Sequence, residues 1–232
     1  MFPTSLTAIE LFGKKRDISL YKAKDTSHHY LLKSIITEDS SIKQAFYDEY
    51  HTLSRLSHPC LPVYYGISES FCPPGQAREA LTLCMEDRSV PALSSPLTFE
   101  EINAVILTTG DILLYLLKNG VLYTDLHPSN LLLSRDFTPE GKTQMQVTLV
   151  DFTYCYYFLT NPAPSYSLRF SYDLSPNLKG QQLLIQSLTY LFYALLEEHH
   201  CTDLPSFVYS LLETGRHPSE ELTLEDFLCM FR

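Results

Sequence analysis

Two short stretches of the sequence place acids and an amide where a strand or loop gains little from them. YTDLHPSNLLL, residues 123–133, contains Asp125 and Asn130 just before an apolar triplet. VTLVDFTYC, residues 147–155, contains Asp151 directly after an apolar run. Carboxylate and carboxamide oxygens at strand ends are the ligands that a divalent cation bound to a polyphosphate needs. The pattern therefore indicates a phosphate-handling site.

Each of these residues also has a purely structural interpretation. Asp125 and Asn130 could cap turns in their loop, as Asx residues often do. Asp151 is harder to explain this way, because an acid between Val150 and Phe152 is costly to bury without a metal or a partner. The secondary-structure elements predicted around these residues help to distinguish the two interpretations.

The first part of the chain reads as a β-rich unit with one helix. Short β-like runs separated by turn-prone segments predict strands at residues 18–24, 29–35, 61–67 and 80–86. Apolar residues at helical spacing predict one helix over residues 41–56, which His58-Pro59 ends. The pattern changes near residue 90.

From that point the sequence is mainly helical. Thr98 and Glu101 form a capping box before an apolar helix that ends near Gly120. Two short strands follow, around residues 130–134 and 146–152, and then two helices, at residues 179–198 and from about residue 204 to 231. We expect an α+β protein with a small β-rich N-lobe at residues 1–88 and a reduced helical C-lobe at residues 89–232.

Four motifs in this order resemble the protein-kinase family, and the resemblance covers nearly the whole chain. Tyr30-Leu31-Leu32-Lys33 resembles the strand with the family's lysine, and Glu49 resembles the helix glutamate that pairs with it. Asp125 and Asn130 resemble the family's catalytic loop, in which an Asn follows an Asp by five positions. Asp151-Phe152-Thr153 resembles the family's D-F-G motif. The resemblance implies a bilobal fold of a minimal, divergent serine/threonine kinase.

The resemblance also implies a role for each matching residue. Lys33, oriented by Glu49, would hold the phosphates of ATP, and Asp125 would accept the proton of the attacking hydroxyl. Asn130 and Asp151 would bind Mg²⁺. The nucleotide would further contact Gly13, which is what remains of the glycine-rich loop, and the hinge-like run Met85, Glu86 and Asp87.

The chain departs from the family in several motifs. Only the first glycine of the glycine-rich loop is present, Tyr123 and Thr124 replace the His and Arg of H-R-D, and Thr153 replaces the glycine of D-F-G. No clear A-P-E follows, since NPAP at residues 161–164 and SYSLRFSYDLSPNL at residues 165–178 occupy that region. The motif D-L-H-P-S-N, which contains His127, is similar to the catalytic loop of the aminoglycoside and choline kinases. Those kinases phosphorylate small molecules.

Three functions are consistent with these motifs. The first is an ATP- and magnesium-dependent kinase acting on serine or threonine hydroxyls of a protein. A small-molecule kinase is the second, favoured by D-L-H-P-S-N and by the loss of peptide-docking motifs. The third is a pseudokinase scaffold that binds a protein partner, favoured by the degraded glycine loop. Retention of all five residues, Lys33, Glu49, Asp125, Asn130 and Asp151, counts against the scaffold.

Composition sets the remaining expectations. With 232 residues, 45% hydrophobic and 19% charged, the chain can bury a sizeable core. A net charge of -10 argues against nucleic-acid partners. Six scattered cysteines without a C-x-x-C pair indicate reduced thiols. The N-terminus is a poor signal peptide, and the most apolar window, residues 183–196, falls short of a membrane span. We expect a cytoplasmic protein that does not bind membranes.

Overall fold

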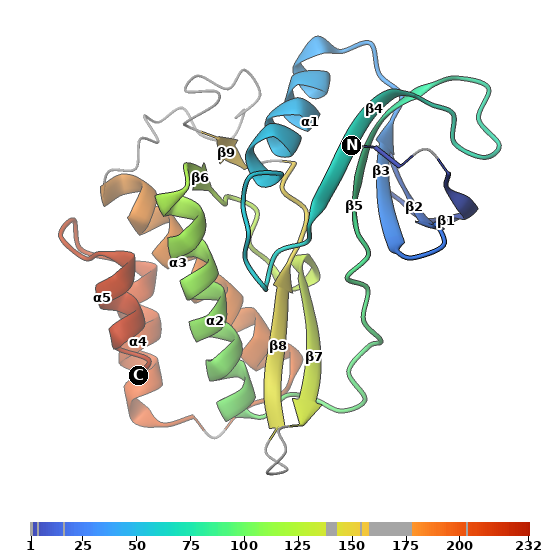
Figure 1. The fold of residues 1–232 in the computed structure, drawn as a ribbon. Coiled ribbons are helices and arrows are strands. Elements are labelled where there is room, and N and C mark those ends of the chain that lie inside the picture. Colours follow the sequence, from blue (N-terminus) through green and yellow to red (C-terminus); the bar gives the residue numbers. More distant parts are fainter. Residues whose placement is uncertain are drawn as a thin grey trace. The chain divides into compact units, whose positions relative to one another are not determined.

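An antiparallel sheet followed by a mainly helical part gives the chain an α+β fold (Figure 1). A computed structural model describes residues 2–3, 5–15, 17–137, 143–153, 155–157, 178–202 and 204–232. These residues form two compact units, one ending at Ser89 and the other beginning at Val90. The expectation of an α+β protein with the sheet first is confirmed at this level.

The first unit is built on a five-stranded sheet with the order β1-β2-β3-β5-β4, in which all neighbours are antiparallel. Its strands are β1 (Thr7–Lys15), β2 (Ile18–Lys24), β3 (His29–Ile35), β4 (Tyr64–Phe71) and β5 (Ala80–Glu86). The runs predicted at residues 18–24, 29–35 and 80–86 form strands with these bounds. β4 begins and ends later than the predicted 61–67.

The sequence pattern does not predict β1, because its pairing with β2 is irregular. Register shifts fall between Thr7 and Glu10 and between Leu11 and Gly13, and Ala8 has a positive φ of 48°. Bulges of this kind break the strict alternation of buried and exposed side chains. As a result Leu11 and Phe12 are adjacent and both exposed.

Strand alternation separates the two faces of this sheet. One face carries a core of Tyr21, Ala23, Tyr30, Leu32 and Cys84, against which residues of the N-terminal segment pack. Successive side chains in a strand project to opposite faces. Lys33, which follows Leu32, therefore projects to the face that carries helix α1 (Ser40–Leu53).

Helix α1 begins after an N-cap aspartate and ends close to the predicted position. The Asp39 carboxylate caps it by accepting from the Ser41 amide at 2.8 Å. The helix ends at Leu53, three residues earlier than predicted and ahead of His58-Pro59. Its buried side includes Phe46, Leu53 and Glu49. A carboxylate on a buried helix face requires a partner, which Lys33 supplies.

The second unit surrounds helix α2 (Phe99–Lys118). Its N-terminus has the predicted capping box between Thr98 and Glu101, and Gly120 has the positive φ of 84° typical of a glycine after a helix. The other elements are β6 (Val121–Leu122), the 3₁₀ turn η1 (Pro128–Asn130), β7 (Leu131–Phe137), β8 (Thr143–Leu149), β9 (Tyr156–Tyr157), α3 (Leu178–Glu198), α4 (Ser206–Arg216) and α5 (Leu224–Cys229).

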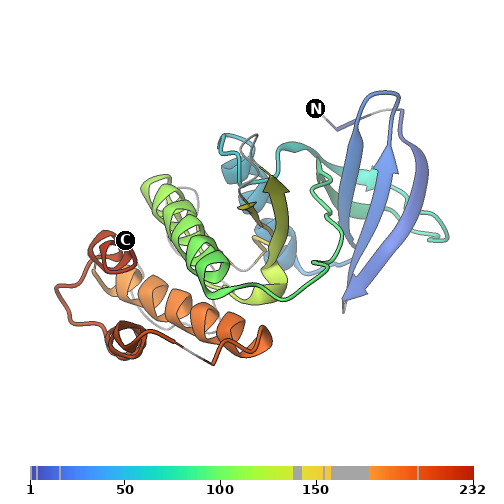
Figure 2. The ribbon, with the colours of Figure 1, turned by 90° about the horizontal axis from the view of Figure 1, so that it is seen from below.

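Helices α2 and α3 lie side by side, with α4 and α5 against α3 (Figures 1 and 2). Two glycines permit the close approach of these helices. A Cβ at Gly110 of α2 would collide with Leu228 of α5, and one at Gly215 of α4 would collide with Thr189 of α3. These glycines therefore let α5 approach α2 closely and α4 approach α3 closely.

The single helix predicted from about residue 204 to 231 is two helices. Pro218 disfavours helical geometry at His217, where α4 ends. Thr223 and Asp226 then form a second capping box that starts α5. The apolar periodicity on both sides of this break belongs to two elements.

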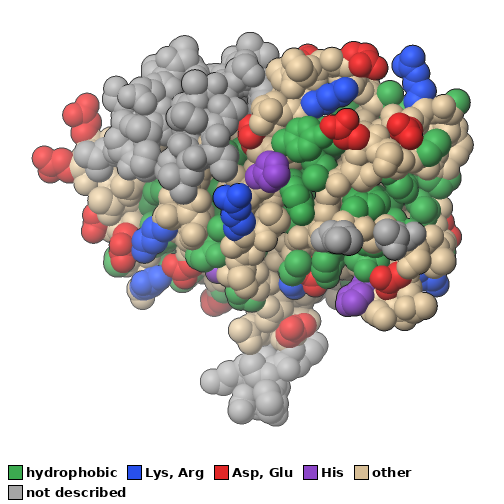
Figure 3. Space-filling view, turned by 45° about the horizontal axis from the view of Figure 1, so that its top comes forward, with side chains coloured by type: hydrophobic (Ala, Val, Ile, Leu, Met, Phe, Trp, Pro, Cys, Tyr) green, Lys and Arg blue, Asp and Glu red, His purple; other side chains and the backbone are tan. Residues whose placement is uncertain are grey.

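The surface mixes charges of both signs. On the face in Figure 3, Lys and Arg side chains of the described residues lie dispersed among acids and apolar side chains. All six cysteines have free thiols. Within the described ranges, no helix combines the length and hydropathy needed to cross a membrane.

Candidate active site

Lys33 and Glu49 form a buried ion pair in the first unit. The Lys33 Nζ lies 3.2 Å from Oε1 and 3.1 Å from Oε2 of Glu49. Lys33 is 5% exposed and Glu49 is 0% exposed. Removing either partner would leave an uncompensated charge in the interior, which is strongly destabilising. The pairing expected from the kinase resemblance is present in the structure.

Two aromatic residues complete the surroundings of this pair. The Tyr64 hydroxyl donates to Glu49 Oε1 at 2.7 Å, and the Phe46 ring centroid lies 5.7 Å from the Lys33 Nζ. A carboxylate with two polar partners is held in one orientation, and it orients the lysine in turn. Tyr64 was not a candidate from the sequence, because the Tyr64-Tyr65 pair reads as ordinary strand and core residues.

Gly13 lies in the same cross-strand row as Lys33. Gly13 pairs with Leu20, and Leu20 pairs with Lys33. Directly opposite residues project to the same face of a sheet. A Cβ at Gly13 would meet nothing within 4 Å, so the fold itself does not require glycine there. A glycine on this face keeps the backbone open to an approaching ligand.

The hinge-like run at the end of β5 is held by structural contacts. Met85 is 6% exposed in the sheet, and Glu86 forms an ion pair with Arg88 at 2.7 Å. Asp87 lies 3.6 Å from Lys22 and accepts from the Ser89 amide at 2.9 Å. The acidic side chains of this run therefore already have protein partners. Its backbone has partners too, because the Glu86 and Asp87 amides donate to the Val63 and His29 carbonyls at 2.8 and 3.3 Å.

In the second unit, Asp125 belongs to a short chain of polar side chains. The His127 Nε2 lies 3.7 Å from Asp125 Oδ2, and the His127 Nδ1 lies 2.8 Å from the Ser129 hydroxyl oxygen. Asp125 and His127 are both about one-third exposed, so they are accessible to a substrate. The pairing fixes the imidazole beside the carboxylate that we expect to receive a proton.

Asn130 joins the loop of Asp125 to the end of strand β8. Its side-chain amide donates to the Asp125 carbonyl at 2.8 Å, and its own carbonyl accepts from the Val150 amide at 3.0 Å. Leu131 pairs with Leu149 in the β7–β8 ladder. Asn130 and Val150 therefore lie opposite each other at the end of this ribbon, next to Asp151.

Asp151 adopts a backbone conformation with φ of +60°. This left-handed region is uncommon for residues other than glycine, but Asp and Asn adopt it more readily than most. The Thr153 hydroxyl donates to Asp151 Oδ1 at 3.0 Å. Thr153 was predicted only as a loss of the D-F-G glycine; the structure gives it a contact that positions the acid.

Tyr123 packs beneath the same turn. Its hydroxyl donates to the Val150 carbonyl at 2.6 Å and to the Asp151 carbonyl at 3.2 Å, and its ring stacks edge-on against Phe152 at 5.2 Å. Burial raises the pKa of Tyr123 well above its usual value, so it stays a neutral donor. Tyr123 thus supports the Asp151 backbone.

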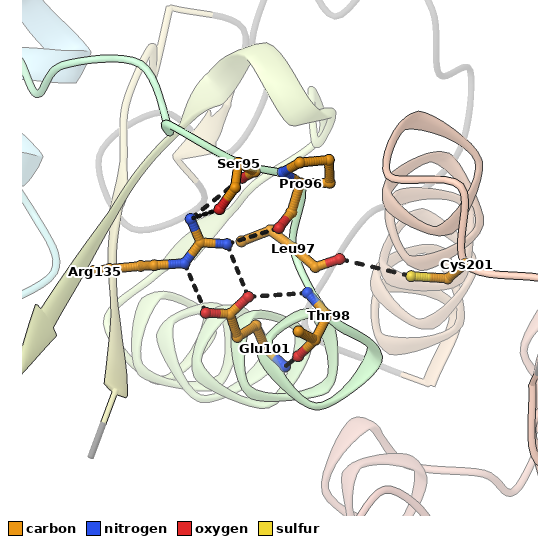
Figure 4. A network of polar contacts seen from close by, with 7 residues as sticks. All are labelled: Ser95, Pro96, Leu97, Thr98, Glu101, Arg135 and Cys201. Atoms are coloured by element: carbon orange, nitrogen blue, oxygen red, sulfur yellow. Dashed lines mark hydrogen bonds and ion pairs between the residues drawn. The ribbon is translucent and has the colours of Figure 1, made fainter. Parts of the chain in front are cut away.

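Arg135 anchors this region to the start of α2 (Figure 4). Its guanidinium binds Glu101 with two contacts, of 2.7 and 2.9 Å, and also donates to the carbonyls of Ser95 and Pro96. Arg135 lies on β7, so the ion pair ties that strand to the Thr98 capping box. On the other side of the same segment, the Cys201 thiol lies 3.7 Å from the Leu97 carbonyl.

The structure thus brings together Asp125, Asn130 and Asp151 in the second unit, and Lys33 and Glu49 in the first. Oxygen donors of this kind suit a hard cation such as Mg²⁺, which binds through one or two carboxylates together with substrate phosphates. Among the described residues no group of three or more His, Cys, Asp or Glu side chains could hold a metal ion by itself.

Comparison with known proteins adds no relative: no protein-family model matches the chain, and no curated protein sequence matches it either.

Proposed function

We propose that the chain is an ATP- and magnesium-dependent kinase with a minimal bilobal protein-kinase-like fold. It transfers the γ-phosphate of ATP to a hydroxyl, and we propose serine or threonine of a cytoplasmic protein as the acceptor. The buried ion pair of Lys33 and Glu49 is the main support. Well-packed apolar residues would stabilise the fold as well or better, so a scaffold gains little from such a pair.

Each residue of the candidate site has a role in this reaction. Lys33, held by Glu49, neutralises charge on the phosphates of ATP. The oxygens of Asp151 and Asn130 fit Mg²⁺, which would neutralise charge that develops on the phosphates. Asp125 accepts the acceptor's hydroxyl proton while the hydroxyl oxygen bonds to the γ-phosphorus. The bond from that phosphorus to the bridging oxygen breaks, and ADP leaves.

A small-molecule acceptor is the second candidate. The observation that favours it is the polar chain of Asp125, His127 and Ser129, in the D-L-H-P-S-N loop that resembles aminoglycoside and choline kinases. A histidine beside the catalytic base can donate a hydrogen bond to a phosphate or to a hydroxyl. A small alcohol needs no peptide-docking motif next to it.

ATP turnover by the purified chain tests the proposal. We expect turnover that requires magnesium, disappears with a chelator and rises with either a protein panel or a panel of small alcohols and aminoglycosides. The panel that stimulates turnover identifies the acceptor class. A folded protein without turnover on any acceptor would contradict the kinase assignment and favour the pseudokinase scaffold.

A further inference from the structure

A groove of about 550 Å³ runs along helices α3 and α4 and the loop that joins them, within the second unit. Its floor is apolar and includes the buried Leu196 and Leu212. Tyr193 and Glu197 of α3 line it together with Tyr209, Glu213 and Arg216 of α4. This volume is in the range of cavities that hold a few side chains of a ligand.

The two walls are exposed helix faces rich in tyrosine. Tyr193 and Glu197 follow helical spacing on α3, and Tyr209, Glu213 and Arg216 do so on α4. Tyr193 is 39% exposed and Tyr209 is 59% exposed. Both tyrosines line the groove. Exposed aromatic side chains gathered in this way mark interaction surfaces.

The charge around the groove is acidic. One wall carries Glu197 and the other Glu213, both exposed, against one cation, Arg216, among the described residues that line the groove. The loop from α3 also starts at a helix C-terminus, whose carbonyl ends favour cations. The complementary ligand is therefore basic.

The groove already holds one cation from its own chain. The Arg216 guanidinium lies 5.4 Å from the Tyr193 ring centroid, and the Tyr193 hydroxyl donates to Glu197 at 2.6 Å. This contact shows that the rim accepts a guanidinium stacked on an aromatic face. Tyr209 and Glu213 present the same chemistry on the opposite wall.

We propose that the α3–α4 groove docks a short basic segment of a partner protein. In this segment an Arg or Lys pairs with Glu213 and stacks on Tyr209, a neighbouring large apolar side chain covers Leu196 and Leu212, and a second basic residue reaches Glu197. The interaction needs neither ATP nor magnesium, so it stands or falls independently of the kinase proposal.

Selection from a displayed library of random dodecapeptides on the full chain tests this docking. We expect the enriched peptides to contain Arg or Lys next to a large apolar residue. The double variant Glu197→Gln/Glu213→Gln should bind a synthetic enriched peptide at least about tenfold more weakly, because it loses both carboxylates. Tyr209→Ala should weaken binding severalfold. Fluorescence polarisation at physiological salt measures both effects.

Two substitutions serve as matched controls. Glu198→Gln changes an exposed acid next to Glu197, and Phe207→Ala removes an exposed aromatic from α4; neither residue lines the groove. Both controls should bind the peptide like the parent. All variants should keep the parental melting temperature, since the amide oxygen that Glu197→Gln introduces can still accept from the Tyr193 hydroxyl.

Three outcomes would overturn the proposal. One is a selection that yields no binder or only acidic peptides. Another is a set of basic peptides whose affinity the double variant does not change. The third is a chain that forms a dimer in solution that the double variant dissociates, because a second copy would then occupy the groove.

Discussion

A single substitution of Asp125 can distinguish a catalytic role of this residue from a purely structural one. Asn is the same size as Asp and forms Asx turns equally well, but it carries no charge and accepts no proton. We expect Asp125→Asn to reduce ATP turnover by roughly 10²-fold or more while leaving the melting temperature and the ATP affinity nearly unchanged. Steady-state kinetics, calorimetry and thermal unfolding measure the three quantities.

Asp136→Asn is the matched control for that substitution. Asp136 is an exposed aspartate of β7 in the same unit, and its replacement should leave turnover at the parental rate. If Asp125→Asn also turned over ATP at the parental rate, Asp125 would be a loop residue and not the catalytic base.

The buried pair of Lys33 and Glu49 gives a prediction about stability. In Lys33→Met the Glu49 carboxylate stays buried and loses its cation, which should cost about 3–5 kcal/mol of unfolding free energy. The double variant Lys33→Met/Glu49→Leu removes both charges and should recover most of that loss. Urea unfolding of the three proteins provides the free energies. A Lys33→Met protein as stable as the parent would show that the pair is not desolvated in solution.

At the residue level, sequence motifs identified candidates by type and spacing but not their supporting contacts. Glu49 was expected to pair with Lys33, and the structure places the two within 3.2 Å. The hydrogen bonds of Tyr64, Tyr123 and Thr153 depend on contacts that the chain makes only when folded. A tyrosine in a strand has the same sequence signature whether its hydroxyl reaches a carboxylate or water.

At the level of elements, the ion pair that joins β7 to the start of α2 should make the stability of the protein depend on pH. The pKa of Glu101 is lower than its ordinary value, mainly because its carboxylate accepts hydrogen bonds from the Arg135 guanidinium. The hydrogen bond from the Thr98 amide lowers this pKa further. A carboxylate with a depressed pKa stabilises the fold above its unfolded pKa, about 4.3, and loses that effect as the pH falls through the folded value.

We therefore expect Glu101→Gln to destabilise the protein by about 1.5–3 kcal/mol at neutral pH, the scale of a hydrogen bond to a charged group. The difference from the parent should shrink as the pH falls below about 4.3. Glu100→Gln, at an exposed acid one residue away, should show no such trend. Thermal unfolding between neutral and acid pH is the measurement. A difference that is constant over this range would contradict the role of the Glu101 charge.

Elements were predictable where a local signal was complete. The Thr98–Glu101 capping box predicted the start of α2, and short β-like runs between turn-prone segments predicted β2, β3 and β5 with their bounds. β1 was missed because its bulges disrupt the alternation, and α4 and α5 were merged because the apolar pattern resumes after Pro218. In both cases the bounds of the element depend on an irregularity of one or a few residues. A periodic pattern read over a longer window does not detect such an irregularity.

For the whole molecule, binding of ATP and magnesium to the proposed site should appear as a change in stability. A ligand that binds only the folded chain stabilises it by an amount set by its concentration relative to its dissociation constant. With ATP and magnesium at about 100 times that constant, the stabilisation is about 2.7 kcal/mol. For a chain of this size that raises the melting temperature by about 5–10 °C.

The magnesium dependence of this shift tests the metal site. Asp151 and Asn130 supply oxygens for a cation but no positive charge for phosphate, so ATP without magnesium should stabilise the parent much less than ATP with magnesium. Asp151→Asn removes the carboxylate and should abolish most of the difference between the two conditions, whereas Asp136→Asn should preserve it. Thermal-shift titrations of the three proteins, with and without a chelator, give the answer. If the parent and Asp151→Asn were stabilised equally by ATP whether or not magnesium was present, Asp151 would not be a metal ligand, and its left-handed turn would serve the fold alone.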